Sequence, residues 1–489
     1  MNTVDIDLEW NANGYETFLR VKSLPRYEFK GSMARIPKEY AHMVGYGKPD
    51  KLESYEAPRW AFDYQRDISS LAIEKQKFAC FVDCGLGKTV LLLEFARHVS
   101  QSIGKKVLIV SPLMVIGQTI SEAERFYNGT LPIKQLRAPT LQSWMDDGSI
   151  DVGITNYESI REGLSTGNLG GMILDESSML KSMYGTWGQR LIDLGKGLQW
   201  KLCLTGTPAP NDRIEYGNHA VFLDRVPTLN AFLAKYFVNR GMTGERWEIK
   251  PHAIRPFYRD LSDWSIFLSN PAAYGWKDNS KPLPPIYTHI HDVPMTDEQT
   301  DAVRSQTGSL FACDLGGIVS RQKMAGIAKG KGGIETRKPA YIKSLVDSWP
   351  EESTLIWCQH NDEQDRMADT FPDAANIDGS TPEDRRQVLV DEFKSGKRKV
   401  MISKGKILGF GLNLQIATRQ IFSGLNDSYE TYYQCVKRSN RTGSKLPLNV
   451  HIPVTDIERP ILENVLRKAS CVEADTKEQE AIFLKERVK

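Results

Sequence analysis

A glycine-rich segment narrows the possible folds of this chain more than any other feature. Asp83 to Thr89 reads DCGLGKT and directly follows the apolar run Phe78 to Val82. Glycines in such a loop let backbone N–H groups turn toward phosphate oxygens without a Cβ clash, and the helix that follows adds its positive end. A buried strand that enters a phosphate-binding loop is typical of a parallel α/β sheet.

The residue types in this loop predict separate tasks. Gly85 and Gly87 would expose backbone N–H groups to phosphate. Lys88 would contact the β- and γ-phosphates of a nucleotide, and Thr89 would offer its hydroxyl to Mg²⁺. The full pattern GxxxxGK(S/T) is incomplete, because Val82 stands where its first glycine belongs. The loop therefore needs support from a second site.

Two adjacent carboxylates supply that support. Gly170 to Ser178 reads GGMILDESS, so an apolar strand ends in Asp175 and Glu176. The carboxyl edge of an open α/β sheet is where ligands bind. Asp175 would hold Mg²⁺ through water, and Glu176 would orient or deprotonate the attacking water. An exposed acidic strand end is the alternative for this pair in isolation; together with the loop, the pair favours ATP hydrolysis.

Length and charge limit the number of domains and the kinds of partner that the chain can have. A chain of 489 residues, 40% of them hydrophobic, is too long for one core, which predicts two or three globular domains. Its net charge of +2 gives no overall attraction to polyanions, so a nucleic-acid surface would need local segregation of charge. Two basic segments, Arg321 to Lys343 and Lys394 to Lys406, offer such a surface, and ordinary solvated faces are the equal alternative.

The cysteines and the amino terminus indicate the compartment. Seven cysteines show neither a CxxC pair nor a zinc spacing, which favours reduced thiols. The amino terminus lacks a basic-then-apolar signal, and no apolar stretch approaches the length of a membrane span. We therefore expect an intracellular, cytoplasmic protein with no membrane partner.

Apolar strands alternate with helical segments through both halves of the chain, as in successive βαβ units. Between the halves, Asn211 to Tyr274 carries aromatic residues at helical spacing and leads to the proline cluster Lys281 to Pro285. The predicted fold class is α/β, with two tandem parallel-sheet lobes and a helical insertion between them. The expected borders are 1–55 for an N-terminal extension, 56–240 for lobe 1, 241–285 for the insertion and linker, and 286–489 for lobe 2. Besides Phe78 to Val82, the expected strands are Val107 to Val110, Val152 to Ile154, Met172 to Leu174, Lys201 to Leu204, Thr354 to Cys358, Ala375 to Ile377, Lys399 to Ser403, Gln420 to Ser423 and Val450 to Val454.

Eight motifs follow one another in a characteristic order. They are the upstream group Phe62, Tyr64 and Gln65, then DCGLGKT, LIVSPL at Leu108 to Leu113, ITNYE at Ile154 to Glu158, LTGTPAPN at Leu204 to Asn211, IDGSTPEDR at Ile377 to Arg385, GFGLNLQ at Gly409 to Gln415, and QCVKRSNRTG at Gln434 to Gly443. The series resembles the superfamily 2 helicases and, within them, the Swi/Snf-type DNA translocases, over about residues 56 to 457. This resemblance implies RecA-like lobes and a nucleic-acid-dependent ATPase of the phage or bacterial kind.

The resemblance also assigns residues to ATP. The Gln65 amide would bond the adenine edge and select ATP over GTP. Arg438 and Arg441, three apart, would lie on one helix face and grip the γ-phosphate from the second lobe; surface cations are the alternative. The catalytic set would be Lys88, Asp175, Glu176, Arg438 and Arg441, with Thr89 and Asp175 at the metal. The remaining cofactor contacts would be Gln65, Asp83, Gly85, Leu86, Gly87, Gly411 and Gln434, besides Lys88 and Thr89.

Phosphate contacts to DNA are implied in the same way. Backbone N–H and hydroxyl donors of both lobes would position one strand without reading its sequence. Thr205 and Thr207 would sense the nucleotide state and transmit it to the DNA. The residues concerned are Ser111, Pro112, Thr155, Asn156, Thr205, Gly206, Ser403, Lys404, Gly411 and Asn413.

Several positions depart from the family pattern. The acidic motif reads DESS where DEAH or DEGH is usual, so Ser178 replaces a histidine that commonly links the ATP site to the LTGTP segment. The arginine-rich helix before the linker is missing, and Ser444 stands where glutamine is typical. Tyr27 to Val44 is faintly similar to the accessory module of annealing-type relatives, with a simple packing extension as the alternative.

These inferences predict an ATP-dependent translocase that uses Mg²⁺ and moves along duplex DNA as a monomer. Duplex DNA is expected in preference to single strands, and DNA in preference to RNA. One alternative is a strand-separating DNA or RNA helicase in phage replication, recombination or repair. A second alternative is a non-catalytic DNA-binding scaffold that has kept the fold.

Overall fold

The structure of the 489-residue chain is a computed structural model. It describes all residues except 1–2, 25–26, 47–54, 182–185, 242–246, 278–282, 308–317, 409–412, 442–443 and 488–489. The chain folds into two compact units. The first contains residues 1–83, 87–277 and 474–489, and the second contains residues 84–86 and 278–473.

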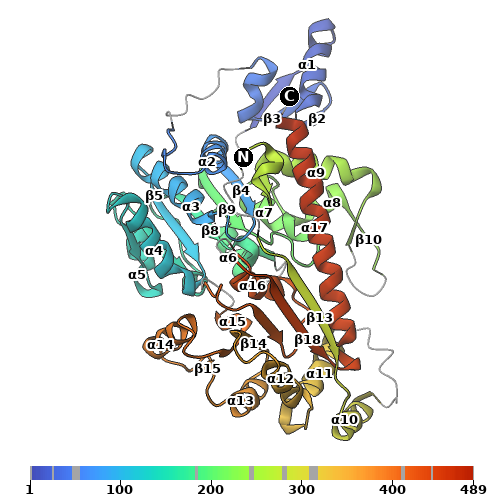
Figure 1. Ribbon diagram of the computed structural model, residues 1–489. Helices are drawn as coiled ribbons and strands as arrows, with labels where there is room; N and C mark the ends of the chain where they lie inside the picture. Colours follow the sequence, from blue (N-terminus) through green and yellow to red (C-terminus); the bar gives the residue numbers. More distant parts are fainter. Residues whose placement is uncertain are drawn as a thin grey trace. The chain divides into compact units, whose positions relative to one another are not determined.

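A small module opens the first unit. Its three antiparallel strands, in the order β1-β3-β2, are covered by helix α1 (Ala12–Ser23) and enclose a separate core that includes Ile6, Val21 and Ile36 (Figure 1). The strands are β1 (Thr3–Asp7), β2 (Glu28–Lys30) and β3 (Met33–Pro37). The Tyr40 hydroxyl joins this module to the rest of the unit, because it donates to the buried carboxylate of Asp263.

The main sheet of the first unit has seven parallel strands in the order β12-β4-β9-β8-β5-β7-β6. Because all strands run the same way, their carboxyl ends share one edge. The strands are β4 (Lys77–Val82), β5 (Lys106–Ser111), β6 (Ile133–Gln135), β7 (Val152–Asn156), β8 (Leu169–Asp175), β9 (Trp200–Thr205) and β12 (Ser265–Leu268).

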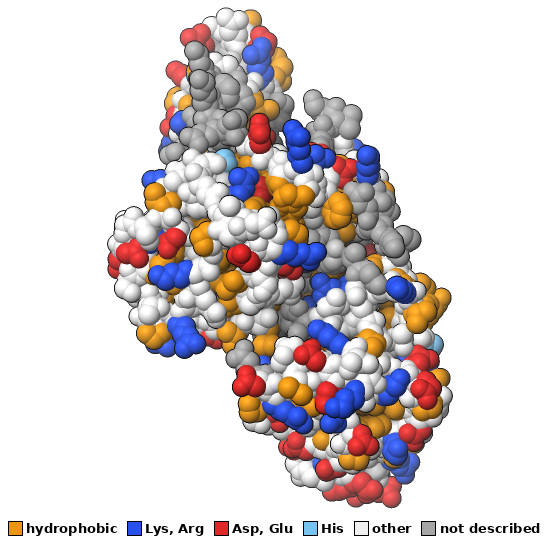
Figure 2. Space-filling view, turned by 60° about the vertical axis from the view of Figure 1, so that its left-hand side comes forward, with side chains coloured by type: hydrophobic (Ala, Val, Ile, Leu, Met, Phe, Trp, Pro, Cys, Tyr) orange, Lys and Arg blue, Asp and Glu red, His pale blue; other side chains and the backbone are white. Residues whose placement is uncertain are grey.

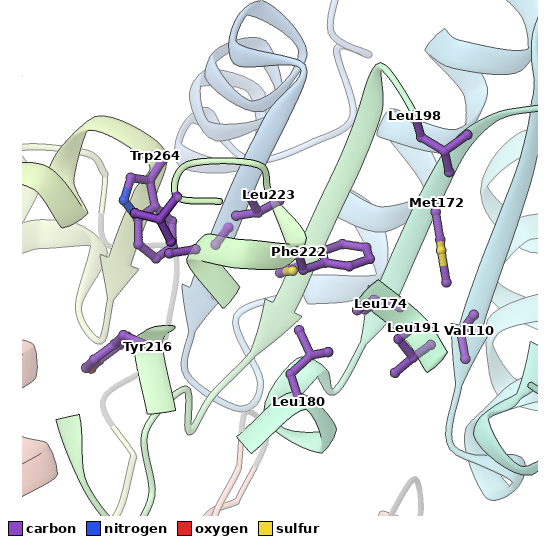
Figure 3. Close-up of a cluster of buried hydrophobic side chains, with 14 of the residues drawn as sticks. Val110, Met172, Leu174, Leu180, Leu191, Leu198, Tyr216, Phe222, Leu223 and Trp264 are labelled. Carbon is purple, nitrogen blue, oxygen red and sulfur yellow. The ribbon is translucent and has the colours of Figure 1, made fainter. Parts of the chain in front are cut away.

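Helices pack on this sheet around the largest buried cluster of the unit. Figure 3 shows ten labelled members, among them Val110 from β5, Leu174 from β8 and Phe222 from α7. Nearly continuous apolar strands are what burial on both faces requires. The helices are α2 (Asp63–Lys75), α3 (Lys88–Arg97), α4 (Leu113–Tyr127), α5 (Ala138–Asp146), α6 (Thr186–Leu194), α7 (Tyr216–Phe222), α8 (Leu229–Tyr236) and α9 (Ile254–Trp264).

The stretch expected to be a helical insertion is only partly helical. It holds α7, α8 and α9, but also the hairpin β10 (Phe237–Asn239) and β11 (Trp247–Ile249). It then returns to the main sheet as β12, whose Ser265–Leu268 pairs with Ala79–Val82 of β4. A four-residue apolar run after a helix carries no periodicity of its own, so the sequence did not predict this strand.

The second unit is built on six parallel strands in the order β13-β18-β17-β14-β16-β15 (Figure 1). The predicted α/β class with two parallel sheets is thereby confirmed. The strands are β13 (Ile286–Asp292), β14 (Thr354–Cys358), β15 (Ala375–Ile377), β16 (Val400–Lys404), β17 (Arg419–Phe422) and β18 (Leu448–Val454). All five strands expected in this half are present, and the edge strand β13 was not predicted.

Helices of the second unit complete its buried hydrophobic clusters. They are α10 (Asp297–Thr307), α11 (Ile318–Ala328), α12 (Lys338–Asp347), α13 (Asn361–Thr370), α14 (Glu383–Lys394), α15 (Gly405–Leu408) and α16 (Tyr429–Ser439). The last helix, α17 (Arg459–Arg487), contributes its residues through Glu473 to the second unit and those from Ala474 on to the first. Within the described residues no helix is long and apolar enough to cross a membrane, and the six cysteines described are all free thiols.

Candidate nucleotide site

The glycine-rich loop connects β4 to α3, as the sequence predicts. Gly85 and Gly87 have φ angles of +88° and +76°, in the left-handed region that side chains rarely adopt. Gly87 is required for a second reason, because a Cβ atom there would lie 2.2 Å from Nε2 of Gln65. Any other residue at position 87 would therefore strain the backbone and displace the Gln65 amide.

Gln65 lies in the first turn of α2 and is 4% exposed. Its Oε1 accepts a hydrogen bond from the backbone N–H of Phe62 at 3.1 Å, which turns its amide nitrogen toward the loop. The Phe62 and Tyr64 rings stack beside it with centroids 5.8 Å apart. The upstream group is thus in direct contact with the phosphate loop. Adenine recognition by Gln65 stays a prediction.

Lys88 is the first residue of α3 and reaches back across the loop. Its Nζ donates to the Val82 carbonyl at 3.0 Å. The ammonium group also lies close enough to Asp175 to favour the ionised carboxylate. This places a cation between the loop and the acidic end of β8, where a nucleotide phosphate would bind.

Asp175 ends β8 and is 8% exposed. The Ser111 hydroxyl, at the end of the neighbouring β5, donates to its Oδ2 at 2.8 Å. Burial and the adjacent Glu176 carboxylate raise the pKa of Asp175, while Ser111 and Lys88 act in the opposite direction. A bound cation would remove this penalty on the charged form.

Glu176 has a φ angle of +55°, which is unusual for any residue with a side chain. Its Oε2 accepts from the Thr205 hydroxyl at 3.2 Å, and that hydroxyl accepts from the Thr207 N–H at 3.1 Å. The LTGTP turn after β9 is therefore bonded directly to the second carboxylate. This contact is the kind of link that a sensor of nucleotide state needs.

The donor set fits Mg²⁺. Asp175 offers a hard carboxylate oxygen, and Thr89 places a hydroxyl at the start of α3. The described residues contain no cluster of three or more histidine, cysteine, aspartate or glutamate side chains that could enclose a metal. Mg²⁺ needs no such enclosure, because it is commonly held by one or two protein oxygens, phosphate oxygens and water.

Tyr157 supports this edge and was not singled out as functional by the sequence. Its hydroxyl donates to the carbonyl of Asp175 at 2.6 Å and to that of Glu176 at 3.3 Å. The ring belongs to the ITNYE segment, so the motif contained the residue although its contact could not be foreseen. Tyr157 fixes the backbone that carries both carboxylates.

Several residues expected to touch DNA use their hydroxyl groups internally. Ser111 donates to Asp175, Thr155 to the Leu136 carbonyl at 3.0 Å, and Ser403 to the Ile377 carbonyl at 2.7 Å. All three are buried. Phosphate contacts from them would have to use the backbone. Of the other expected DNA contacts, Pro112 precedes α4, Asn156 ends β7, Gly206 follows β9, Lys404 bonds Asn361, and Asn413 is exposed.

Arg438 and Gln434 lie one turn apart on α16 in the second unit. Arg438 donates from Nε to the Gln434 carbonyl at 3.1 Å and is 7% exposed. Nε2 of Gln434 is buried and has no hydrogen-bond partner among the described residues. Gly411, also expected at the nucleotide, lies outside the described residues.

Arg441 does not share a helix face with Arg438, so that prediction is wrong. Helix α16 ends at Ser439. The hydroxyl of Ser444 donates to the Ser439 carbonyl at 2.6 Å and accepts the Arg441 N–H at 3.2 Å, so it satisfies groups that a continued helix would have bonded. The chain therefore turns before Arg441.

Some cations of the two basic segments are bonded within the protein. Lys338 is 1% exposed and its Nζ lies 2.5 Å from Oε2 of Glu458, while the buried Lys329 donates to the Leu425 carbonyl at 2.8 Å. In the second segment, Lys397 and Arg398 both pair with Glu392. Figure 2 shows positive and negative side chains interspersed on the face drawn there. Lys329 and Lys338 therefore serve packing. Other cations of these segments are exposed, namely Lys323, Lys331, Arg337, Lys394 and Lys406, and a nucleic-acid surface there stays a prediction.

Comparisons with known proteins place the chain in a family. Residues 75–236 match the SNF2-related domain and residues 337–443 match the helicase conserved C-terminal domain. The putative ATP-dependent helicase/translocase YwqA of Bacillus subtilis (strain 168) is 25% identical over 409 residues, which cover 77% of this chain and 44% of that protein. The DNA annealing helicase and endonuclease ZRANB3 of Bos taurus is 23% identical over 436 residues, which cover 82% and 38%. The chain thus spans less than half the length of either relative.

A solved structure described as a Sulfolobus solfataricus SWI2/SNF2 ATPase core in complex with dsDNA shares 17% sequence identity. The match covers 88% of this chain and 96% of that one, with a TM-score of 0.40. A phosphate loop and paired carboxylates on one parallel sheet, followed by a second parallel sheet, define the two-lobed class of P-loop ATPases. Within that class, the chain belongs to the superfamily 2 helicases of the Swi/Snf type, a group of nucleic-acid-dependent ATPases.

Proposed function

We propose that this protein hydrolyses ATP and uses the energy to move along duplex DNA. One observation carries the proposal: a single sheet edge brings together a phosphate loop with Lys88, a buried Asp175 bonded to Ser111, and Glu176 bonded to Thr205. Phosphoryl transfer to water needs a phosphate cradle, a metal-binding carboxylate and a group that activates water. The phosphate cradle follows β4, and the two carboxylates lie together at the end of β8 in the same sheet.

The proposed roles follow from position. The loop N–H groups and Lys88 bind the phosphates, Thr89 and Asp175 hold Mg²⁺, and Glu176 orients or deprotonates the attacking water. When bound, Mg²⁺ would neutralise charge that develops on the phosphate oxygens. Arg438 and Arg441 are proposed as cations that stabilise the transition state, an assignment supported by the QxxxRxxRxG spacing.

The DNA substrate is proposed from the relatives. One is named a helicase/translocase and the other a DNA annealing helicase. The bond from Thr205 to Glu176 offers a route by which the state of the nucleotide could reach the LTGTP turn, and from there the phosphate-contacting segments. We propose duplex DNA as the track and a monomer as the active form.

Steady-state ATP hydrolysis tests this function. Rates are measured without nucleic acid and with single-stranded DNA, duplex DNA, forked DNA or RNA, at one fixed salt concentration because such binding depends on salt. Glu176→Gln is the matched control, since it keeps size but loses the base. Stimulation by plain duplex supports translocation; stimulation only by single strands, forks or RNA indicates a strand-separating helicase. No hydrolysis above the control indicates a scaffold.

A further inference from the structure

The chain turns sharply directly after the two carboxylates. Glu176 adopts a left-handed backbone conformation, and residues Ser177–Lys181 then form a short 3₁₀ helix. L-amino acids with side chains rarely occupy this conformation, and they keep it only where neighbouring contacts enforce it. The structure therefore raises the question of which contacts hold the turn.

Helix α7 holds the turn through two consecutive residues. Nδ2 of Asn218 donates to the Leu180 carbonyl at 2.5 Å. The next residue, His219, lies with Nε2 3.1 Å from the Ser177 hydroxyl oxygen. Ser177 and His219 are both fully buried, and Asn218 is 4% exposed. A two-point attachment of this kind fixes the turn against the helix.

The direction of the Ser177 hydrogen bond can be derived. Nδ1 of His219 lies 3.3 Å from the Glu215 carbonyl, which can only accept. Burial lowers the pKa of His219 to about 4, so the ring is neutral near pH 7 and carries one N–H. That hydrogen belongs on Nδ1. Nε2 is then an acceptor, and Ser177 donates its hydroxyl hydrogen to it.

The ring itself is held in place. The Phe81 side chain of β4 meets the His219 ring edge-on, with centroids 5.3 Å apart at 86°. Phe81 immediately precedes Val82, the strand end that accepts the Lys88 ammonium. The imidazole thus stands between the strand that carries the phosphate loop and the turn that carries Glu176.

We infer that His219 is a positioning residue for hydrolysis: by accepting the Ser177 hydroxyl, it keeps Glu176 in the backbone conformation that presents its carboxylate. The inference rests on the proposed role of Glu176. Ser178, in the place where relatives commonly carry histidine, is buried and bonds only weakly to the Glu176 carbonyl, at 3.5 Å. The imidazole beside the acidic motif comes instead from α7, which follows the LTGTPAPN segment. A core histidine that merely packs is the competing explanation.

Three substitutions separate these explanations. His219→Gln retains an amide oxygen that can reach the position of Nε2 and accept from Ser177. His219→Leu fills similar space without an acceptor, and Ser177→Ala removes the donor with little change in size. Leu191→Ala is the matched control, because Leu191 is fully buried in the hydrophobic cluster that also contains Leu180 of the turn, and its side chain has no hydrogen-bonding group (Figure 3).

The measurement is kcat and KM for ATP on the full-length chain with the most stimulating nucleic acid. We expect His219→Leu and Ser177→Ala to lower kcat about tenfold with KM unchanged within about twofold, as when an interaction that acts in the transition state is lost. His219→Gln should restore most of kcat. The double variant Ser177→Ala/His219→Leu should be no slower than the worse single variant, because both remove one bond.

Other results overturn the inference. If His219→Leu keeps the wild-type kcat, or if Leu191→Ala lowers kcat equally, the histidine only packs. Glu176→Gln, run beside these variants, tests the proposed function separately. If Glu176→Gln hydrolyses ATP normally, Glu176 is not the hydrolytic carboxylate and the inference falls with that assignment. If Glu176→Gln is inactive while His219→Leu is normal, the proposed function stands and only the inference fails.

Discussion

The two parallel sheets use buried charge in opposite ways. Near the carboxyl end of the first sheet, Asp175 and Glu176 receive hydroxyl hydrogen bonds, and neither carboxylate forms a salt bridge within the part of the chain that the structure describes. At the same end of the second sheet, Lys338 is bonded to the Ser423 carbonyl and neutralised by Glu458. The two carboxylates, which are proposed to act on a bound ligand, have little opposite charge beside them, whereas Lys338 is paired with an acidic side chain of the protein. Under the proposed function, the end of the first sheet would be a reactive edge, whereas the Lys338–Glu458 pair at the end of the second sheet serves folding.

The largest expected effect is at the reactive edge. Glu176→Gln should lower kcat by about a hundredfold or more, because the side chain that activates water is lost. Melting temperature should change little, since the amide oxygen can still accept from Thr205. Single-turnover hydrolysis and thermal melting are the measurements. A variant that loses both activity and stability would mean that Glu176 serves folding, and the contrast between the two edges would disappear.

Lys338→Met should have the converse effect. Removing one partner of a buried ion pair leaves Glu458 uncompensated and destabilises by about 3 to 5 kcal/mol. Hydrogen exchange should rise in β17 and β18 while the first unit binds ATP with unchanged affinity. Lys343→Met, which breaks the exposed pair with Asp347, is the control and should cost less than about 0.5 kcal/mol. Equal losses in both variants would contradict the structural role of Lys338.

The stability of the first unit should depend on pH because His219 takes up a proton on unfolding. Its pKa is about 4 when folded and 6.5 in the unfolded chain, so between these values the unfolded state binds more protons. Stability should therefore fall as pH drops from 6.5 to 4, by about 3 kcal/mol at most. The raised pKa of Asp175 acts in the opposite direction.

His219→Gln should flatten this slope in hydrogen exchange of the first unit. The second unit supplies an internal comparison, because burial also lowers the pKa of His451 to about 4. Its pH response should be unaffected by the substitution. A slope in the first unit that persists without His219 would assign the titration to other groups.

Ser444→Ala should have the smallest effect. It removes the hydroxyl that bonds the Ser439 carbonyl and the Arg441 N–H, so we expect a loss of about 1 kcal/mol in the second unit. Ser305→Ala, whose exposed hydroxyl bonds the Ala302 carbonyl, is the matched control and should be close to neutral. If kcat also falls, the turn before Arg441 takes part in catalysis.

Sequence reasoning succeeded where information is local. The loop at Asp83 to Thr89 and the carboxylates at Asp175 and Glu176 are each contained in one contiguous segment, and each segment follows a continuous apolar run of the kind that forms a buried strand. It failed where a contact joins distant residues. His219 lies 42 positions from Ser177, and nothing in either segment indicates that they meet. The sequence also did not indicate that Lys329 and Lys338 are buried, because a charged residue in a sequence carries no information about which group it bonds.

Some strands and one helix end could not be predicted for a similar reason, because they depend on residues outside their own segment. β6, β12 and β13 are short or exposed strands without a clear alternation, and each owes its place to a neighbouring strand. The end of α16 at Ser439 depends on Ser444, whose substitution for the usual family residue was noted from the sequence but not its consequence. Side chains that cap a helix from beyond its end are weak signals in a single sequence.

The position of Tyr40 affects which truncated fragments of this protein can be expected to fold. Its hydroxyl is one of three groups around the Asp263 carboxylate, which also lies 2.9 Å from Nζ of Lys75 and 3.5 Å from Nη1 of Arg225. A chain shortened to begin after Val44 would lack Tyr40 and would leave the Asp263 carboxylate without this hydrogen bond. Residues 1–44 therefore contribute to the packing of the first unit, and purified fragments that lack them should be tested for solubility before any loss of activity is ascribed to a lost function of the module.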